Sequence, residues 1–252
     1  MKGFTRFLGK EATEILRTWR IWVLPGVLLF FALSGPILAK LTPQLVGSLT
    51  SGQGVSITVP PPTYLDAYTQ WVKNLGQIGV FLLIGVSAGL VAGERARGTA
   101  VLVLTKPVSR GGFVVAKYLA NAVLVIAATA VGTLITWGLT AAVFSEAPPA
   151  RLFAATAAWL VFALMLLAAM VLLSSAMSTL AAVGVGVGIF AALGILNLWG
   201  PAVRYTPAGL LGAPSNLLLG QAANTTWPLV TGAAVTVGLV AAAVWVFRRV
   251  EI

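Results

Sequence analysis

The sequence contains no cysteine and no histidine, and only six of its 252 residues are acidic. The missing side chains exclude disulfides, thiol nucleophiles, histidine general bases and the usual zinc ligands. Charged residues of both signs make up 9% of the chain, whereas a soluble globular domain carries about 25%. The chain therefore cannot cover itself with a water-facing surface, and we expect it to use lipid as its solvent.

Several short motifs of enzymes are also missing. The sequence contains no G-x-x-x-x-G-K-[ST] phosphate loop, no G-x-S-x-G elbow and no H-E-x-x-H pair. Its six acidic residues are scattered, so no two form an obvious acid–base couple or metal cage. Charges are nearly absent from the apolar stretches, which argues against an ion-coupled carrier. We expect no catalytic residues, no metal site and no cofactor bound by this chain.

What the sequence has in abundance is apolar length, with 59% hydrophobic residues and a mean hydropathy of +0.98. A helix needs about 20 mostly apolar residues to cross a bilayer. The prediction is a single all-α integral membrane domain, residues 1–252, with six transmembrane helices. The six stretches that qualify are 21–39, 75–92, 114–144, 152–173, 180–199 and 228–247.

Residues 1–20 are predicted to form an amphipathic helix on the membrane surface. Apolar residues recur at spacings of three and four from Phe4 to Trp19, and basic residues occupy much of the remaining face. The alternative is a secretory signal peptide, because a basic start precedes an apolar run. The basic region is long and contains Glu11 and Glu14, which favours the amphipathic helix.

The net charge of +10 comes from basic residues that flank apolar stretches. This pattern is typical of anchoring at lipid headgroups and not of a nucleic-acid-binding face. The positive-inside rule places both termini in the cytoplasm, with the chain in the cytoplasmic membrane of a bacterium or archaeon. Of the sixteen basic residues, only four fall on the other side: Lys40, Lys73, Arg151 and Arg204.

Two segments on the predicted outer side, 40–72 and 200–227, are too short to form independent domains. In the first, a run of three prolines precedes Asp66, Tyr68 and Trp71, which we expect on an interfacial helix. Binding an extracytoplasmic partner is one role open to these segments.

Three carboxamides fall within the predicted spans, at Gln77, Asn121 and Asn197. One interpretation is that they line a pathway for an amphiphilic substrate whose movement is driven by a partner's energy. The alternative is that each forms a hydrogen bond between helices. The sequence leaves both interpretations open.

Glycines on two spans predict close helix packing. Gly85, Gly89 and Gly93 form two overlapping G-x-x-x-G steps on the second span, and Gly184 and Gly188 lie on the fifth. Small residues let helix backbones approach closely in lipid. Packing within the chain is the favoured interpretation, and a dimer interface is the alternative.

Between the second and third spans, residues 94–110 carry polar residues on both sides of a short apolar run. Ser109 can cap the helix that follows. The pattern predicts a short amphipathic helix that can receive a push from a cytoplasmic partner, and an ordinary positive-inside loop is the alternative. The residues assigned to this element are Glu94, Arg95, Arg97, Gly98, Thr99, Lys106, Pro107 and Arg110.

Residues 94–110 closely resemble the signature of type-2 ABC exporter permeases. That signature combines a glutamate, Arg-Gly-Thr as at 97–99, a leucine-rich stretch and Pro-Val-Ser-Arg as at 107–110. A lysine opens the third span, and here Lys117 takes its place. The ending 247–252 and the overall plan are also similar, so the resemblance covers the whole chain. The sequence departs from the signature at Ala100 and Val101, where leucine or glutamate often stands.

The resemblance implies a transmembrane subunit of an ATP-binding-cassette exporter. Two separate ATPase subunits would hold ATP and Mg and receive the coupling helix, and a second permease subunit, identical or different, would complete the transporter. Spans two and five would line the route between subunits. We expect Glu94 and Arg97 to form an ionic latch, with Lys106 and Arg110 contacting the ATPase. The runner-up function is a non-transporting membrane scaffold or assembly factor for an extracytoplasmic protein.

Overall fold

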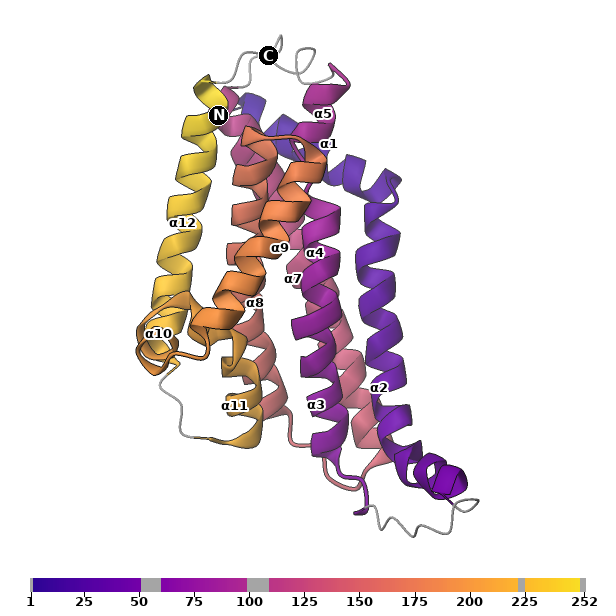
Figure 1. Ribbon diagram of the computed structural model, residues 1–252. Helices are drawn as coiled ribbons and strands as arrows, with labels where there is room; N and C mark the ends of the chain where they lie inside the picture. Colours follow the sequence, from indigo (N-terminus) through magenta and orange to yellow (C-terminus); the bar gives the residue numbers. More distant parts are fainter. Residues whose placement is uncertain (1, 51–59, 99–108, 222–224, 250–252) are drawn as a thin grey trace.

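The computed structural model of the protein describes residues 2–50, 60–98, 109–221 and 225–249 (Figure 1). Every regular element in these ranges is a helix or a helical turn. Six of them are long and apolar enough to cross a membrane, which confirms the predicted all-α fold with six spans. These are Arg20–Val46, Tyr64–Ala96, Arg110–Val143, Pro149–Ala176, Thr179–Leu196 and Thr226–Arg249.

The first half of the chain supplies an N-terminal helix and three spans. α1 (Lys2–Arg17) precedes α2 (Arg20–Thr50), which contains three prolines. The second span is built from α3 (Tyr64–Asn74), a π-helical turn η1 (Leu75–Gly79), α4 (Val80–Ser87) and the short α5 (Ala92–Ala96). The third span is α7 (Arg110–Val143), whose N-cap Ser109 accepts a hydrogen bond from the Gly112 amide, as predicted.

The second half contains three further spans with a helical excursion between the last two. α8 (Pro149–Ala176) and α9 (Thr179–Leu196) are separate helices, because Ser178 caps α9 just after α8 ends. The segment after α9 folds into α10 (Gly200–Tyr205), a 3-10 turn η2 (Pro207–Leu211) and α11 (Ala213–Leu219). α12 (Thr226–Arg249) is the last span.

α8 lies at the centre of the bundle and packs against α4, α7, α9, α11 and α12. Its buried residues include Phe162 and Leu166, together with many alanines. Alanine and glycine let neighbouring backbones approach closely where lipid supplies no hydrophobic drive between helices. Gly186 on α9 shows the effect most clearly, because a Cβ there would lie 2.6 Å from the Met170 sulfur on α8.

The second span begins eleven residues earlier than predicted, at Tyr64 instead of 75. The helix around 66–71, predicted to be interfacial, is continuous with the second span, and its Tyr68 and Trp71 are fully buried. Gly132 of α7 makes room for the Trp71 ring. A Cβ at position 132 would lie 2.5 Å from that ring, so only glycine allows the indole to pack there. Thr63 caps this helix, and its backbone N–H donates to the Asp66 carboxylate at 2.7 Å.

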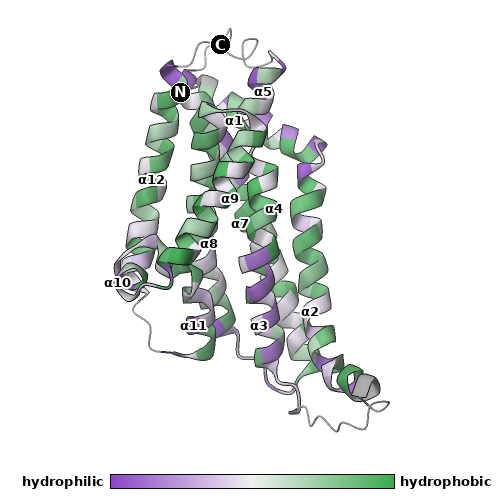
Figure 2. Ribbon diagram, viewed as in Figure 1, coloured by the Kyte–Doolittle hydropathy of each residue, from purple (hydrophilic) through white to green (hydrophobic). Residues whose placement is uncertain are grey.

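The elements divide between two ends of the bundle (Figure 1). α1, α5 and the last turn of α12 lie together at one, which we call the α5 end, and α10, α11 and the start of α3 lie at the other, the α11 end. Figure 2 shows the long middle portions of the spans mainly in green, while α3 is largely purple. Polar residues therefore gather at the α5 end and along α3.

Candidate functional site

α1 is fastened to the bundle by a stack of three aromatic rings. Phe7 of α1 stacks on Phe113 of α7 with 5.5 Å between ring centroids. The Phe113 ring in turn stacks on Phe247 of α12 at 5.1 Å, with the planes only 8° apart. Aromatic pairs contribute about 0.5–1.5 kcal/mol beyond their buried area. Three elements that are far apart in sequence thus meet at one ring.

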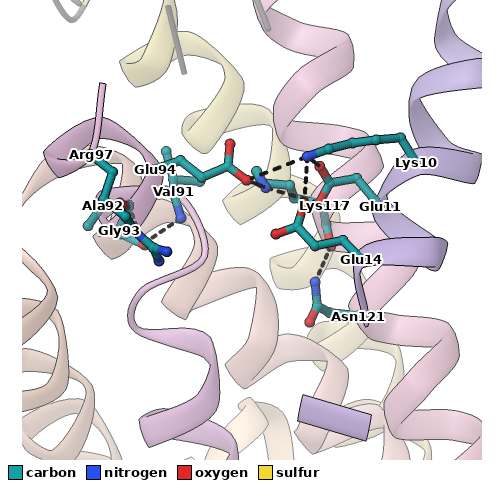
Figure 3. Close-up of polar contacts among 11 residues, drawn as sticks. Lys10, Glu11, Glu14, Val91, Ala92, Gly93, Glu94, Arg97, Lys117 and Asn121 are labelled. Atoms are coloured by element: carbon teal, nitrogen blue, oxygen red, sulfur yellow. Dashed lines mark hydrogen bonds and ion pairs between the residues drawn. The ribbon is translucent and has the colours of Figure 1, made fainter. Parts of the chain in front are cut away.

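Directly beside this stack, the ammonium group of Lys117 joins two carboxylates from different elements (Figure 3). Its Nζ donates to Glu94 Oε1 of α5 at 2.6 Å and to Glu11 Oε2 of α1 at 2.9 Å. The Lys117 side chain is completely buried, Glu11 is 2% exposed and Glu94 is 12% exposed. Removing one partner of a buried ion pair costs about 3–5 kcal/mol, because it leaves an uncompensated charge. α1, α5 and α7 are therefore held together by one buried cation.

A second cation closes the solvent side of this group. Lys10 Nζ lies 2.6 Å from Glu14 Oε2, 3.1 Å from Glu11 Oε1 and 3.8 Å from Glu94 Oε1. Burial would lower the pKa of Lys10, but the hydrogen bond that Lys10 donates to Glu14 and the charges of Glu11 and Glu94 raise it overall. Burial would likewise raise the pKa of Glu14, and its bond to Lys10 lowers it overall. We call these five residues, Lys10, Glu11, Glu14, Glu94 and Lys117, the Lys117 cluster.

The three carboxylates of the Lys117 cluster offer oxygens that all lie within 4.8 Å of one another. Such spacing is compatible with a cation site, but two ammonium groups already lie among these oxygens. The geometry is that of an ion-pair network between helices.

α5 has a further attachment, to the end of α8, through Ser174. The helix is interrupted between Ser87 and Ala92, and the buried Ser174 hydroxyl bridges the interruption. This hydroxyl accepts from the Val91 and Ala92 amides at 3.0 Å each and donates to the Ala88 carbonyl at 2.7 Å. It replaces backbone partners that the interrupted helix lacks.

Arg95 reinforces the same junction, because its Nη1 donates to the Ser175 carbonyl at 2.8 Å. Ser174 was not among the predicted functional residues. Its signal is the Ser-Ser pair at 174–175, which ends a long apolar run.

The predicted coupling residues lie partly in this arrangement. Glu94 and Arg95 make the contacts just described, and Gly98 ends the helix with a φ of +68°, a conformation that favours glycine. Arg97 is exposed, and its Nε donates to the Gly93 carbonyl at 3.1 Å. Among the described residues, Glu94 forms ion pairs with Lys117 and Lys10, and the latch with Arg97 stays a prediction.

The remaining coupling residues fall outside this group. Arg110 begins α7, and its Nη1 donates to the Arg248 carbonyl of α12 at 3.0 Å. Thr99, Lys106 and Pro107 lie outside the described residues.

The three predicted pathway carboxamides are not brought together within the chain. Asn121 is buried, and its amide donates to the Lys117 carbonyl at 2.8 Å on its own helix. Gln77 faces a cavity beside α8, α9 and α11. Asn197 lines a different cavity near α10, and its Oδ1 is buried with no partner in the described part of the chain.

The predicted packing glycines differ from one another. A Cβ at Gly89 would lie 3.7 Å from Thr179 of α9, and one at Gly93 would meet only the Arg97 side chain. Gly85, Gly184 and Gly188 have no atom of the described chain within 4 Å of a Cβ position. Close packing within the chain therefore falls at other glycines, such as Gly132 and Gly186.

The chain is similar to known membrane proteins over most of its length. The sequence pattern of the family described as ABC-2 family transporter protein matches residues 7–216. The uncharacterized transmembrane protein YxlG of Bacillus subtilis (strain 168) is 25% identical over 258 residues, which cover 100% of this chain and 99% of that protein. The family match includes every residue of the Lys117 cluster.

Proposed function

This chain belongs to the ABC-2 family of transporter proteins, and from that membership we propose that it is the permease subunit of an ATP-driven exporter. The ATP-hydrolysing subunits are separate chains, which hold ATP and Mg. The observation that carries the proposal is the Lys117 cluster, because it ties α5 to α1 and to the third span through buried ion pairs. A force applied to α5 is then transmitted to three elements together.

The proposed orientation places the α5 end in the cytoplasm and the chain in the cytoplasmic membrane. Basic residues support it: Arg95, Arg97, Arg110, Arg248 and Arg249 all belong to elements at the α5 end. An excess of Lys and Arg marks the cytoplasmic side of membrane proteins.

In the proposed cycle, ATP binding closes the pair of ATPase subunits and displaces the 94–110 segment. Glu94 pulls Lys117 and Glu11 with it, so α1 and α7 tilt together. The Ser174 bridge passes the same displacement to α8. The exposed Arg97, with Lys106, is proposed to contact acidic residues of the ATPase.

A second permease subunit is part of the proposal. Its docking surface is supported by Gly85 on α4 and by Gly184 and Gly188 on α9, which leave open space around their Cβ positions in the described chain. Open small residues on neighbouring helices permit a close approach by another helix.

The first test is purification of the tagged chain in mild detergent, with identification of the proteins recovered in stoichiometric amount. We expect an ABC ATPase to be recovered with the unaltered chain and lost with the double variant Arg97→Glu/Lys106→Glu. Lys40→Glu, at the opposite end, is the control and should retain the partner. Recovery of the unaltered chain with only extracytoplasmic proteins would overturn the proposal and favour the scaffold function.

A second readout tests transmission separately from assembly. Glu94→Ala should still recover the ATPase, but substrate-stimulated ATP turnover of the complex should fall by about tenfold, since α5 no longer pulls Lys117. Full stimulated turnover in an assembled Glu94→Ala complex would contradict the role given to the Lys117 cluster.

A further inference from the structure

Gln77 occupies an unusual position on the second span. It lies in the π-helical turn η1 and its side chain is exposed on the bundle, with no hydrogen-bond partner in the described part of the chain. A carboxamide without a partner in an apolar medium costs several kcal/mol, about 2–7 depending on the reference state. π-helical turns frequently occur at functional sites. Both features indicate that a molecule outside this chain meets Gln77.

Gln77 lines a cavity of about 250 Å³ between α3, α8, α9 and α11. One wall combines Gln77 with Lys73, and the facing wall is aromatic, with Trp159, Phe162 and Phe190. Phe190 is held in place by edge-on contact with Phe81 at 5.6 Å. The cover comes from the segment between the last two spans, through Leu210, Leu211, Pro214 and Ser215.

The charge of this cavity is positive. Lys73 is exposed and forms no ion pair within the described chain, and no aspartate or glutamate is among the residues lining the cavity. Trp159 is only 4% exposed, yet its indole N–H has no acceptor among the described residues. A cation and a carboxamide therefore line a space that lacks a protein acceptor for them, and the indole of Trp159 forms part of its wall.

The polar and aromatic walls of the cavity lie at different depths in the bilayer, with Lys73 nearest the membrane surface. Residues 73 to 96 rise about 35 Å along the span, slightly more than the hydrocarbon thickness of about 30 Å. With Ala96 at one membrane surface, the Lys73 ammonium lies at headgroup level on the other. Gln77 and the aromatic rings lie one turn or more deeper, because Trp159 and Phe162 are ten and more residues into α8.

We propose that this cavity binds an anionic amphiphile from the leaflet at the α11 end, with a phosphate or carboxylate headgroup on Lys73 and Gln77. The start of its hydrocarbon chain packs on Phe162 and Phe190. A volume of about 250 Å³ is below that of pockets that enclose a whole drug-sized molecule. The cavity therefore takes the headgroup region and the first methylenes, while the rest of the molecule remains in the bilayer.

The test measures binding by the full-length chain and does not require an ATPase partner. The chain is purified, stripped of lipid by detergent exchange, and mixed with phosphatidylglycerol or phosphatidylcholine of identical acyl chains. Bound lipid is counted by native mass spectrometry. We expect phosphatidylglycerol to bind about fivefold more tightly than phosphatidylcholine, as one lysine near the membrane surface warrants.

Matched variants locate the site. Lys73→Gln should reduce phosphatidylglycerol binding to the level of phosphatidylcholine, while Lys40→Gln, an exposed lysine that lines none of the cavities described, should not change it. Phe190→Ala should weaken binding of both lipids, because it removes the wall that holds the chain. Equal loss in Lys73→Gln and Lys40→Gln, or unchanged binding in Phe190→Ala, would overturn the proposal in favour of diffuse surface attraction. If Phe190→Ala does not fold, Gln77→Leu takes its place. Undiminished binding of phosphatidylglycerol by Gln77→Leu would also overturn the proposal.

Two sources of the ligand are distinguished by ATP turnover in the assembled transporter. A transported molecule leaves the cavity during turnover, and a structural lipid of the leaflet stays bound. Either result supports the site, and only this last measurement rests on the proposed function.

Discussion

At the α5 end, the fully buried Lys117 has carboxylate partners at 2.6 and 2.9 Å. At the α11 end, Lys73 and Gln77 line a cavity without a hydrogen-bond or ion-pair partner in the described chain. Lys117 lies on α7 beside α5, and Lys73 lies on α3, but only Lys117 has ion-pair partners within the described chain. Polar groups that satisfy each other fix helices together, whereas polar groups left open are available to a ligand. We therefore call the α5 end the rigid end, because its charged groups pair with each other, and the α11 end the receptive end, because its polar groups are open to a ligand.

The largest expected effect comes from breaking the rigid end at its centre. Lys117→Met removes the cation and leaves Glu11 and Glu94 buried next to each other, which should lower the free energy of unfolding by about 3–5 kcal/mol. Denaturant unfolding of the purified chain in detergent measures it. Lys73→Met, at the receptive end, is the comparison and should change the same quantity by less than about 1 kcal/mol. Similar losses for the two lysines would remove the distinction between the ends.

A smaller effect is expected at the α8 junction. Ser174→Ala deprives the Val91 and Ala92 amides of their acceptor, at a cost of about 1–3 kcal/mol. Hydrogen exchange at these two amides should accelerate in the variant. Ser175→Ala is the matched control, because the Ser175 hydroxyl donates only to the Val171 carbonyl of its own helix. Unchanged exchange at Val91 and Ala92 in Ser174→Ala would show that the bridge does not hold α5.

The smallest effect concerns the solvent side of the Lys117 cluster and depends on pH. The pKa of Glu14 is lowered from 4.5, so its stabilisation is present above that value and is lost as the pH falls through the lowered pKa. The pKa of Lys10 is raised from 10.5, so its contribution is present below that value and is lost as the pH rises through the raised pKa. Docking of α1 should therefore be constant near neutrality and weaken at both extremes.

A fluorophore on an introduced Thr13→Cys reports this docking, since the chain has no other cysteine. Its anisotropy should fall at acid pH in the otherwise unaltered chain. In the Glu14→Gln variant, the fall in anisotropy at acid pH should be smaller. An equal fall in anisotropy at acid pH with and without Glu14 would exclude the Lys10–Glu14 pair as its cause.

The sequence is a good guide to the spans and a poor guide to partners. Apolar length predicts six spans because only helices of that length satisfy their backbone groups in lipid. The pairing of Lys117 with both Glu94 and Glu11 was not predicted, since it depends on where α1 packs against α7, and two complete spans separate residues 11 and 117 in the sequence. Arg97 was the expected partner because charged residues are concentrated in this one segment of the sequence.

The beginning of the second span was missed for a related reason. Asp66 and Lys73 make the 64–74 region polar, which is typical of an interfacial helix. Its burial depends on Trp71 entering the space above Gly132 of α7, a contact between residues that no local pattern connects. Gln77, by contrast, was recognised from sequence as an unusual polar residue, and its cavity became visible only with α11 in place.

The three-ring stack has a consequence for biosynthesis. Phe113 carries Phe7 on one neighbouring element and Phe247 on another, so its ring is completely covered only after α12 has been made and inserted. Until then, one face of the Phe113 ring lacks its partner beside the buried lysine. A chain that stops short of Phe247 would leave that face uncovered, so the last span completes the packing that holds the first helix to the third span.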